Sequence, residues 1–228
     1  MSVCNQIWLK KFDSGPASKE FQSRAARSLL QVACRSSGVE LKSEHLILRG
    51  PELIDHVDKN FGLSISITHC AQIVAVAVGR GRLGLDCEPM GKIRNWQGIA
   101  DQFFTSEEAN TVANASTNEQ ERVFLRHWVL KESYIKSIKG SVFGDLNKLT
   151  LTNQSKAAHV KSSYSNHNKW AWVGSFAGCV LGVYCTNASE PELAFYETTD
   201  LSDTRCTTRR KQVPGSFIPI NQYLSTRT

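Results

Sequence analysis

Residues 117–139 are predicted to form one long helix that is apolar around nearly its whole circumference. A capping-box pattern precedes the apolar run, and Lys139-Gly140 is typical of a helix end. Such a helix is buried, so its charged residues need partners, because burial of an unpaired charge is costly. The alternative is an exposed pair four residues apart, worth little on a wet surface. The charged residues are Lys131, Glu132 and Lys136.

The composition of the 228 residues, with 41% hydrophobic residues, is that of an ordinary globular protein. No apolar run approaches the ~18 residues that span a bilayer, and the N-terminus lacks the basic and apolar regions of a signal peptide. The seven cysteines are scattered and form no C-x-x-C motif, which favours reduced thiols. We therefore expect a cytoplasmic protein that does not bind a membrane.

The chain is basic, with a net charge of +6 and an isoelectric point of about 9.0. This charge favours an anionic partner, which could be a nucleic acid, a phosphorylated small molecule or an acidic protein surface. Charge alone does not choose among the three.

The residues before the long helix are predicted to include one helix and several strands. Ser18 is a good N-cap for a helix over residues 18–37, and Gly38 ends it. Arg49-Gly50-Pro51 is predicted to be a turn. Alternating apolar and polar residues from Leu63 to His69 predict a half-buried strand. The other strands predicted here cover residues 1–12, 46–48, 73–78 and 83–88, the last two joined by a hairpin at 79–82.

The residues after the long helix are predicted to be mostly strand, so each half has a helix followed by a small antiparallel meander. This layout suggests a duplicated α+β unit. Between the halves, residues 90–116 are polar and contain a second capping box at Thr105–Glu108. We place the subdomains at residues 1–95 and 96–195 and interpret 196–228 as a polar and basic tail. The later strands are predicted at residues 148–152, 158–164, 169–176 and 179–185, with an edge strand at 193–196.

Two carboxylates, Asp86 and Glu88, stand two residues apart on a predicted strand. The two-residue period of a strand puts both side chains on one face. Like charges this close repel each other unless a cation lies between them, and hard oxygen ligands suit Mg²⁺. The alternative is a pair of acidic residues at a strand end in water.

His69 ends a predicted strand directly after Thr68. An imidazole and a hydroxyl at a strand end can bind phosphate, although a single histidine can equally be structural. The predicted helix over residues 18–37 carries Arg24 and Arg27 on its polar face, where a solvated surface is the alternative to an anion contact.

Four motifs occur in order, and together they resemble the Sfp-type 4′-phosphopantetheinyl transferases. That family's pattern is a strand ending in Ser/Thr-His-Ser, a Gly-hydrophobic-Asp-x-Glu strand, a Phe-Phe element and Trp-x-x-Lys-Glu-Ser/Ala-x-x-Lys. The resemblance covers roughly residues 15–185 and implies an α+β pseudo-dimer of two similar subdomains, each a small antiparallel sheet against a long helix. The motifs here are Ser64-Ile-Ser-Ile-Thr-His69, Gly84-Leu-Asp-Cys-Glu88, Phe103-Phe104-Thr-Ser-Glu-Glu108 and Trp128-Val-Leu-Lys-Glu-Ser-Tyr-Ile-Lys136.

The resemblance implies transfer of the phosphopantetheine arm of coenzyme A to a serine of an apo acyl or peptidyl carrier protein, leaving adenosine 3′,5′-bisphosphate. It implies Mg²⁺, with Mn²⁺ as an alternative, held by Asp86, Glu88 and Glu132. It also implies a monomer, because the duplication supplies an interface that shorter relatives make between subunits. The implied catalytic residues are Asp86, Glu132 and Lys136, and the implied coenzyme contacts are Arg24, Arg27, Arg49, Thr68, His69, Lys131 and Lys136.

Two positions depart from the family pattern. The order Arg49-Gly50 reverses the usual Gly-Lys/Arg before proline, which weakens the case for Arg49. Cys70 stands where the family has a serine after the histidine. The pattern leaves open which carrier is served, whether of fatty acid, polyketide, polyunsaturated fatty acid or nonribosomal peptide synthesis.

Two other functions are compatible with the sequence. A basic nucleic-acid-binding module is one, but the cations are not concentrated in a stripe with interleaved aromatic residues, so we expect no nucleic-acid partner. A metal-dependent phosphohydrolase that uses Asp86, Glu88 and Glu132 is the other. A carrier-protein substrate distinguishes the two enzymes, because hydrolysis needs none.

Overall fold

The computed structural model describes residues 5–13, 17–92, 94–140, 146, 149–151, 158–160, 168–187, 193–198, 208–211 and 215–221. Its helices are α1 (Lys19–Ser36), α2 (Ser43–Leu46), α3 (Gly50–Phe61), α4 (Trp96–Phe103), α5 (Ser106–Ala113) and α6 (Thr117–Ser137). Its strands are β1 (Asn5–Lys11), β2 (Ser64–His69), β3 (Ile73–Gly79), β4 (Leu83–Pro89), β5 (Leu149–Leu151), β6 (Ala158–Val160), β7 (Asn168–Phe176), β8 (Cys179–Asn187), β9 (Leu193–Thr198), β10 (Thr208–Lys211) and β11 (Gly215–Asn221).

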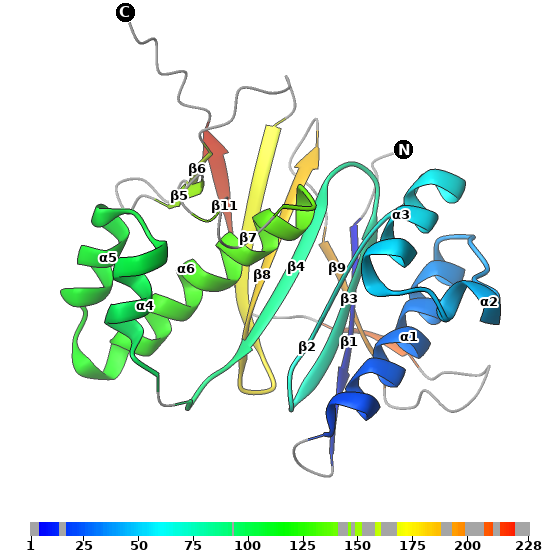
Figure 1. Cartoon of the computed structure of the whole chain (residues 1–228), viewed down its shortest axis with the longest axis horizontal. Coiled ribbons are helices and arrows are strands. Elements are labelled where there is room, and N and C mark those ends of the chain that lie inside the picture. Colours follow the sequence, from blue (N-terminus) through cyan, green and yellow to red (C-terminus); the bar gives the residue numbers. More distant parts are fainter. Residues whose placement is uncertain are drawn as a thin grey trace, which may run out of the picture.

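The strands form two mainly antiparallel sheets (Figure 1). Sheet 1 has the order β10-β9-β1-β3-β2, and sheet 2 has the order β4-β8-β7-β11-β6-β5. Among the described strand pairs, β1–β9 and β11–β6 are parallel and the others are antiparallel. Together with the helices, these sheets confirm the predicted α+β class.

Each half of the chain contributes a strand to the sheet built mainly by the other half. β4 follows β3 in the sequence but pairs with β8, where Asp86 lies opposite Gly182. In return, β9 pairs with β1, where Phe195 lies opposite Ile7. The predicted hairpin at residues 79–82 is therefore wrong: the chain does turn at Gly81 (φ +77°), but it then crosses to the other sheet. The pseudo-dimer and the boundaries between residues 95 and 96 and between 195 and 196 stay predictions.

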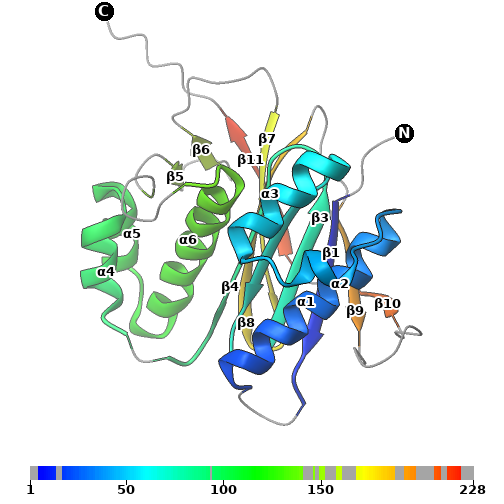
Figure 2. The ribbon, with the colours of Figure 1, turned by 45° about the vertical axis from the view of Figure 1, so that its right-hand side comes forward.

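Helices cover the outer faces of the two sheets, and the inner faces share one core (Figure 2). α1 and α3 pack on sheet 1, and α6 packs on β4 and β8 of sheet 2, with α4 and α5 beside it. On β3, Ile73 faces the core between the sheets and Val74 faces the helices. Because both faces of β3 are covered, all its residues are buried, which explains its unbroken apolar run.

Local capping signals predicted the main helices well. The Ser18 hydroxyl accepts a hydrogen bond from the Phe21 N–H (3.2 Å) at the start of α1, and Thr105 and Glu108 form the capping box of α5. α6 covers most of the predicted residues 117–139, but the predicted capping box of Thr117 and Gln120 is wrong: the N-cap is Ser116, which makes no side-chain capping hydrogen bond. None of the described helices is long and apolar enough to cross a membrane.

Other segments differ from the sequence prediction. Residues 46–48 are not a strand, since Leu46 ends α2. Arg49-Gly50-Pro51 begins α3 instead of a turn, because a proline in the first helical turn has a favourable φ and needs no N–H partner. α4 was not predicted. β10 and β11 lie in the segment interpreted as a tail, so β10 and not β9 is the edge of sheet 1.

Candidate active site

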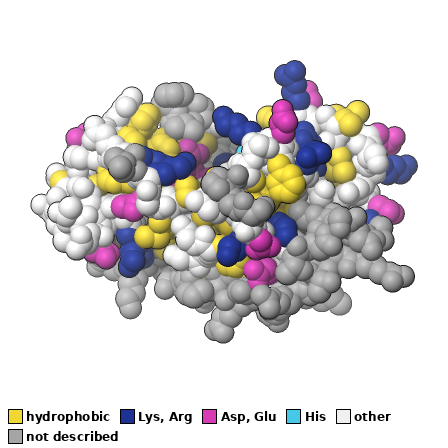
Figure 3. All heavy atoms as spheres, turned by 90° about the horizontal axis from the view of Figure 1, so that it is seen from below, with side chains coloured by type: hydrophobic (Ala, Val, Ile, Leu, Met, Phe, Trp, Pro, Cys, Tyr) yellow, Lys and Arg dark blue, Asp and Glu magenta, His cyan; other side chains and the backbone are white. Residues whose placement is uncertain are grey.

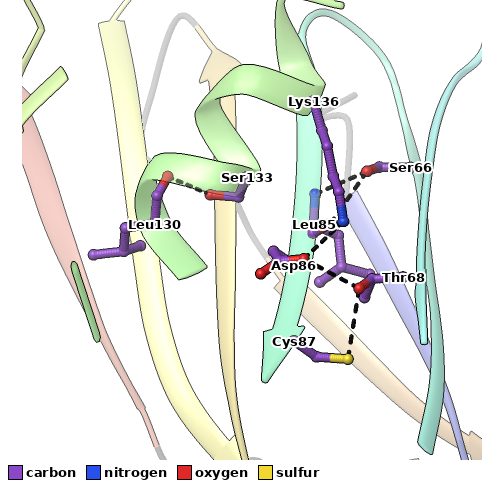
Figure 4. A network of polar contacts seen from close by, with 8 residues as sticks. All are labelled: Ser66, Thr68, Leu85, Asp86, Cys87, Leu130, Ser133 and Lys136. Carbon is purple, nitrogen blue, oxygen red and sulfur yellow. Dashed lines mark hydrogen bonds and ion pairs between the residues drawn. The ribbon is translucent and has the colours of Figure 1, made fainter. Parts of the chain in front are cut away.

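The edge strands β2 of sheet 1 and β4 of sheet 2 pack against each other, and we call this junction the seam (Figure 4). The Ser66 hydroxyl accepts a hydrogen bond from the Leu85 N–H (2.9 Å). The Thr68 hydroxyl donates to Asp86 Oδ1 (3.2 Å). Side chains of β2 thus satisfy polar groups along an edge of sheet 2 that none of the described strands covers. The hydroxyl-rich motif and the Asp-x-Glu motif meet here.

Gly84 on β4 and Gly182 on β8 allow α6 to approach sheet 2 closely. A Cβ atom at Gly84 would lie 1.7 Å from the carbonyl oxygen of Ser133, so any larger residue would push the helix away. The close approach brings the Lys136 side chain onto β4, where Nζ lies 2.7 Å from Asp86 Oδ1. The glycine of the Gly-x-Asp-x-Glu motif therefore positions the helix that carries the last motif.

Asp86 is buried at the seam, and its two carboxylate oxygens differ. Oδ1 receives both the Thr68 hydroxyl and the Lys136 ammonium group. Oδ2 is also buried but has no hydrogen-bond partner among the described residues. Leaving a buried carboxylate oxygen unpaired costs free energy, and such an atom is typical of a site that an ion or ligand completes.

Glu132 lies on α6 one turn before Lys136, and its environment disfavours a negative charge. Burial raises the pKa of its carboxyl group from 4.5 to about 7. The charge of Asp86 and, less strongly, that of Glu88 add to this increase, while Lys136 opposes them. The three carboxylates therefore act on one another across the contact between α6 and β4.

Glu88 is held by a residue that the sequence prediction missed. Its Oε2 atom accepts a hydrogen bond from the Arg94 guanidinium group at 2.6 Å, and both side chains are about a fifth exposed. Arg94 in turn lies over the Trp96 ring, 5.3 Å from the ring centroid. The sequence gives only a weak signal for this pair, because a single arginine in a polar loop six residues after Glu88 does not indicate which acidic residue it binds.

The three carboxylates fit a hard divalent cation. Within the described residues, no group of three or more acidic, histidine or cysteine side chains is close enough to hold an ion by itself. Mg²⁺, however, takes one or two carboxylates and fills its remaining positions with water and substrate phosphates. The unpartnered Oδ2 of Asp86 and the excess negative charge around Glu132 suit such an ion.

A cleft of about 490 Å³ opens at the seam, with walls from α1, α3, β2, β4 and α6. Part of its lining is apolar and comes from α3 and the residues just before it, including Leu48, Pro51 and Ile54. This lining suits a substrate that combines phosphate groups with less polar parts. The polar lining consists of Ser23, Arg27, Thr68, His69, Asp86, Glu88 and Lys136.

His69 lines this cleft and is oriented by a second residue that the sequence prediction missed. Its Nδ1 lies 2.9 Å from Gln22 Oε1. The Gln22 amide nitrogen donates to the Ala17 carbonyl (2.6 Å), so the glutamine presents its oxygen to the histidine. His69 is an exposed residue, but partial burial and, next to it, the charge of Lys136 lower the pKa of its imidazole. This arrangement leaves Nε2 available to a ligand.

The three predicted arginines occupy different positions. Arg27 lines the cleft and donates to the Ser23 hydroxyl (2.8 Å). Arg24 is exposed, with its guanidinium carbon 6.0 Å from the Phe21 ring centroid, and is not among the residues lining the cleft. Arg49 is exposed at the N-cap of α3 and is likewise not a lining residue, although Gly50 after it is. The structure thus favours Arg27 as the anion contact.

Lys131 has a different role from the predicted one. Its side chain is fully buried, with Nζ 2.9 Å from Glu108 Oε2 and 2.9 Å from the Leu146 carbonyl oxygen. It also lies 5.4 Å from the Phe104 ring centroid. Successive helical residues point about 100° apart, so Lys131 faces α5 while Glu132 is turned toward the sheet. Lys131 is fully buried with these partners and is not among the residues that line the cleft, so the structure gives no support to the prediction that it contacts the coenzyme.

Comparison with known proteins agrees with the motifs. The model of the 4′-phosphopantetheinyl transferase superfamily matches residues 82–207, more than half of the chain. The chain is 29% identical over 105 residues to the 4′-phosphopantetheinyl transferase gsp of Aneurinibacillus migulanus, covering 46% of this chain and 44% of that relative. It is 24% identical over 90 residues to the 4′-phosphopantetheinyl transferase HetI of Nostoc sp., covering 39% and 38%. Each alignment thus spans less than half of the relative's length.

The region matched by the family model begins just before β4 and contains α6. It therefore includes Asp86, Glu88, Glu132 and Lys136, the charged groups that α6 and β4 bring together at the seam. The chain belongs to the 4′-phosphopantetheinyl transferase superfamily.

Proposed function

We propose that the protein transfers the 4′-phosphopantetheine group of coenzyme A to a serine hydroxyl of an apo acyl or peptidyl carrier protein. The observation that carries this proposal is the meeting, at one cleft on the seam, of acidic groups suited to a cation with Arg27, His69 and Lys136. Coenzyme A has a pyrophosphate, a separate 3′-phosphate and a less charged arm, and the lining of the cleft offers partners for each. We also propose that the protein works as a monomer in the cytoplasm.

Asp86, Glu88 and Glu132 are the residues that would hold Mg²⁺, or Mn²⁺, against the pyrophosphate. The bound ion would supply positive charge that offsets the charge developing on the leaving adenosine 3′,5′-bisphosphate. Asp86 offers its unpartnered Oδ2, while Glu88 would exchange its hydrogen bond to Arg94 for the ion. Arg94 would therefore bind Glu88 only while the ion is absent.

Glu132 is proposed to accept the proton of the acceptor serine, directly or through a water molecule. The serine oxygen forms a bond to the phosphorus of the pantetheine phosphate, and the bond from that phosphorus to the oxygen of the adenosine bisphosphate breaks. A base works best when its pKa lies near the working pH, and burial has raised the pKa of Glu132 to about 7. Nearby positive charge lowers this pKa and keeps the carboxylate ionised.

Lys136 is proposed to neutralise the transferred phosphate. Burial disfavours its charge, but Asp86 outweighs this effect and raises the pKa of Lys136, so the ammonium group stays protonated. Its Nζ also donates to the Leu85 carbonyl (3.2 Å), which fixes the group at the edge of the cleft. His69 and Arg27 are proposed to bind the 3′-phosphate.

One face of the molecule gives no support to a nucleic-acid-binding module. On the face shown in Figure 3, lysine and arginine side chains alternate with acidic and hydrophobic ones and form no continuous basic stripe. A protein that follows a nucleic-acid backbone needs such a stripe or groove. The phosphohydrolase alternative shares the carboxylates and must be separated by experiment.

The test is a transfer assay with purified protein, Mg²⁺, coenzyme A and a panel of apo carrier proteins. We expect the mass of at least one carrier to increase by that of one phosphopantetheine group, as in a holo-[acyl-carrier-protein] synthase reaction. A Ser→Ala carrier variant serves as the control. No addition to any carrier by the folded protein would overturn the proposal. Cleavage of coenzyme A at an equal rate without a carrier would favour the phosphohydrolase instead.

A further inference from the structure

Three cysteine sulfurs gather at one end of the seam, where β2 ends. Cys70 Sγ lies 3.5 Å from Cys179 Sγ, and Cys87, between the two carboxylates of β4, is also within hydrogen-bonding range of Cys70. Thr68 connects this group to the acidic residues, since its hydroxyl contacts both Cys87 Sγ (3.5 Å) and Asp86 Oδ1 (3.2 Å). The cysteine group therefore borders the proposed active site through Cys87, which Figure 4 shows linked to Asp86 by the Thr68 hydroxyl.

Cys70 and Cys179 are far apart in the sequence but are held together by the fold. Cys70 directly follows β2 of sheet 1, and its N–H donates to the Ile73 carbonyl (2.9 Å) in the turn to β3. Cys179 begins β8 of sheet 2, opposite Pro89 of β4. A bond between the two sulfurs would thus join the sheets, and the sulfurs already lie 3.5 Å apart, against the ~2.05 Å of a disulfide.

Cys70 is also the accessible and more acidic member of the pair. Of the five cysteines that the structure describes, it is partly exposed and the other four are buried. Its sulfur lies within hydrogen-bonding range of Cys179 and Cys87, and these contacts lower the pKa of Cys70. A thiolate that is exposed and lies beside a second thiol is the arrangement that favours oxidation to a disulfide.

We propose that Cys70 and Cys179 are an oxidative modification site that forms a reversible disulfide when the protein meets a hydroperoxide. The Cys70 thiolate attacks the peroxide oxygen, and an alcohol or water leaves as Cys70 becomes a sulfenic acid. The Cys179 sulfur then attacks Cys70 Sγ and releases water. In total, two thiols lose two electrons and two protons, and the hydroperoxide is reduced to an alcohol or water plus a second water. A dithiol reverses the reaction.

The disulfide is expected to act on the neighbouring cleft, and this part rests on the proposed function. Cys70 follows His69 directly, and Cys179 lies opposite the residue after Glu88. Drawing Cys70 toward β8 would move His69 away from its bond with Gln22. We expect the KM for coenzyme A to rise about fivefold in the oxidised protein, with recovery after reduction.

The test treats the full-length protein with one to three equivalents of hydrogen peroxide and measures its mass, its peptide map and its Tm. We expect the mass to fall by two hydrogen atoms, with a Cys70–Cys179 cross-linked peptide that dithiothreitol removes. A disulfide that closes so long a loop constrains the unfolded chain, so Tm should rise by several degrees. None of these readouts requires the transferase activity, so they separate this site from the proposed function.

The controls use single cysteine variants. Cys70→Ser, which restores the residue usual in the family, and Cys179→Ala should both abolish the cross-link. Cys34→Ala should retain it, because Cys34 is buried on α1 away from the cysteine group. Oxidation of Cys70 to sulfinic acid without a cross-link, or cross-links that involve other cysteines instead, would overturn the proposal. A cross-linked protein with an unchanged KM for coenzyme A would overturn its regulatory part.

Discussion

Two lysines of α6 each form an ion pair with a carboxylate, but the pairs differ in completeness. Lys131 and Glu108 have no exposed surface, and Glu108 Oε2 also accepts hydrogen bonds from the Thr105 N–H (2.9 Å) and hydroxyl (3.0 Å). The Lys136 side chain is 32% exposed, and its partner Asp86 keeps one buried oxygen without a partner among the described residues. The first pair is closed and the second is open.

The difference shows how one helix combines a structural and a functional charge. Breaking a closed, dry pair leaves a charge stranded in the interior, so this pair fixes α6 against α5. The open pair retains free donor and acceptor capacity beside the cleft, which a ligand can use. Lys131 and Lys136 are the same residue type on the same helix, five residues apart. The difference between the two ion pairs therefore comes from the packing around each lysine.

Glu132→Gln should have the largest effect of all on activity, because Glu132 lies on α6 one turn from the open Lys136–Asp86 pair. It removes the proposed base and one proposed ion ligand while preserving shape, so kcat/KM for transfer should fall at least about a thousandfold. Tm should not fall. Glu119→Gln is the matched control, because Glu119 is exposed on the same helix and, within the part of the chain that the structure describes, pairs with Arg122 at 3.8 Å. Retained activity in Glu132→Gln would exclude this residue from the chemistry.

Among changes to the closed Lys131–Glu108 pair, Lys131→Met should have the largest effect on stability. It leaves Glu108 charged and unpaired in the core, so the free energy of unfolding should fall by about 3–5 kcal/mol in urea titrations. Lys131→Met with Glu108→Leu should recover much of this loss. Lys139→Met breaks the half-exposed pair with Asp55 and should cost less than about 1 kcal/mol. Equal losses in Lys131→Met and Lys139→Met would contradict the special status of the buried pair.

The ion-free protein should lose stability as the pH rises, because of Glu132. Its folded-state pKa of about 7 lies above the ordinary 4.5, so the folded state binds the proton more tightly than the unfolded state. The stabilisation is complete below pH 4.5 and is lost as the pH passes 7, by about 2–3 kcal/mol in total. Unfolding of the wild type and of Glu132→Gln in EDTA at pH 5 and pH 8 measures this difference. An identical pH dependence in both proteins would contradict the assignment.

His69→Ala should weaken coenzyme binding more than chemistry. Loss of one hydrogen bond to an anionic phosphate should raise the KM for coenzyme A about tenfold, with kcat within about twofold. Steady-state kinetics with saturating carrier measure both constants, and Gln22→Ala should show a weaker version of the same effect, because Gln22 orients the ring. An unchanged KM would refute the 3′-phosphate assignment.

Arg27→Ala and Arg24→Ala form the smallest and most direct comparison, three residues apart on α1. Arg27 lines the cleft, so Arg27→Ala should raise the KM for coenzyme A about threefold. Arg24 is exposed and does not line the cleft, so Arg24→Ala should change the KM for coenzyme A less than about 1.5-fold. The opposite order would show that α1 presents Arg24, not Arg27, to the coenzyme.

Features with a local physical cause could be read from the sequence. The N-cap at Ser18, the capping box at Thr105 and the apolar run of β3 each depend on neighbouring residues, and the structure has all three. Pairings between distant segments had no such signal. Nothing near β4 indicates that it leaves β3 for β8, and nothing near β9 indicates that it joins β1.

The candidate site divides in the same way. The motifs alone were enough to propose the carboxylates as ion ligands: strand period put Asp86 and Glu88 on one face, and the resemblance to the family added Glu132 from the helix. They could not show that Arg94 holds Glu88 or that Gln22 orients His69, because these partners come from a loop and a helix with no spacing relation to the motifs.

The two lysines of the last motif show most clearly where prediction from the sequence alone ends. From the chain alone, both are cations on one buried helix, and each qualifies equally as a phosphate contact. Folding places Glu108 and Phe104 around Lys131 and places Asp86 and the cleft beside Lys136. Helical rotation of about 100° per residue gives the directions, but the elements that meet each direction come from other parts of the chain. Their packing encloses one lysine and leaves the other beside the cleft, where we propose that it meets the substrate.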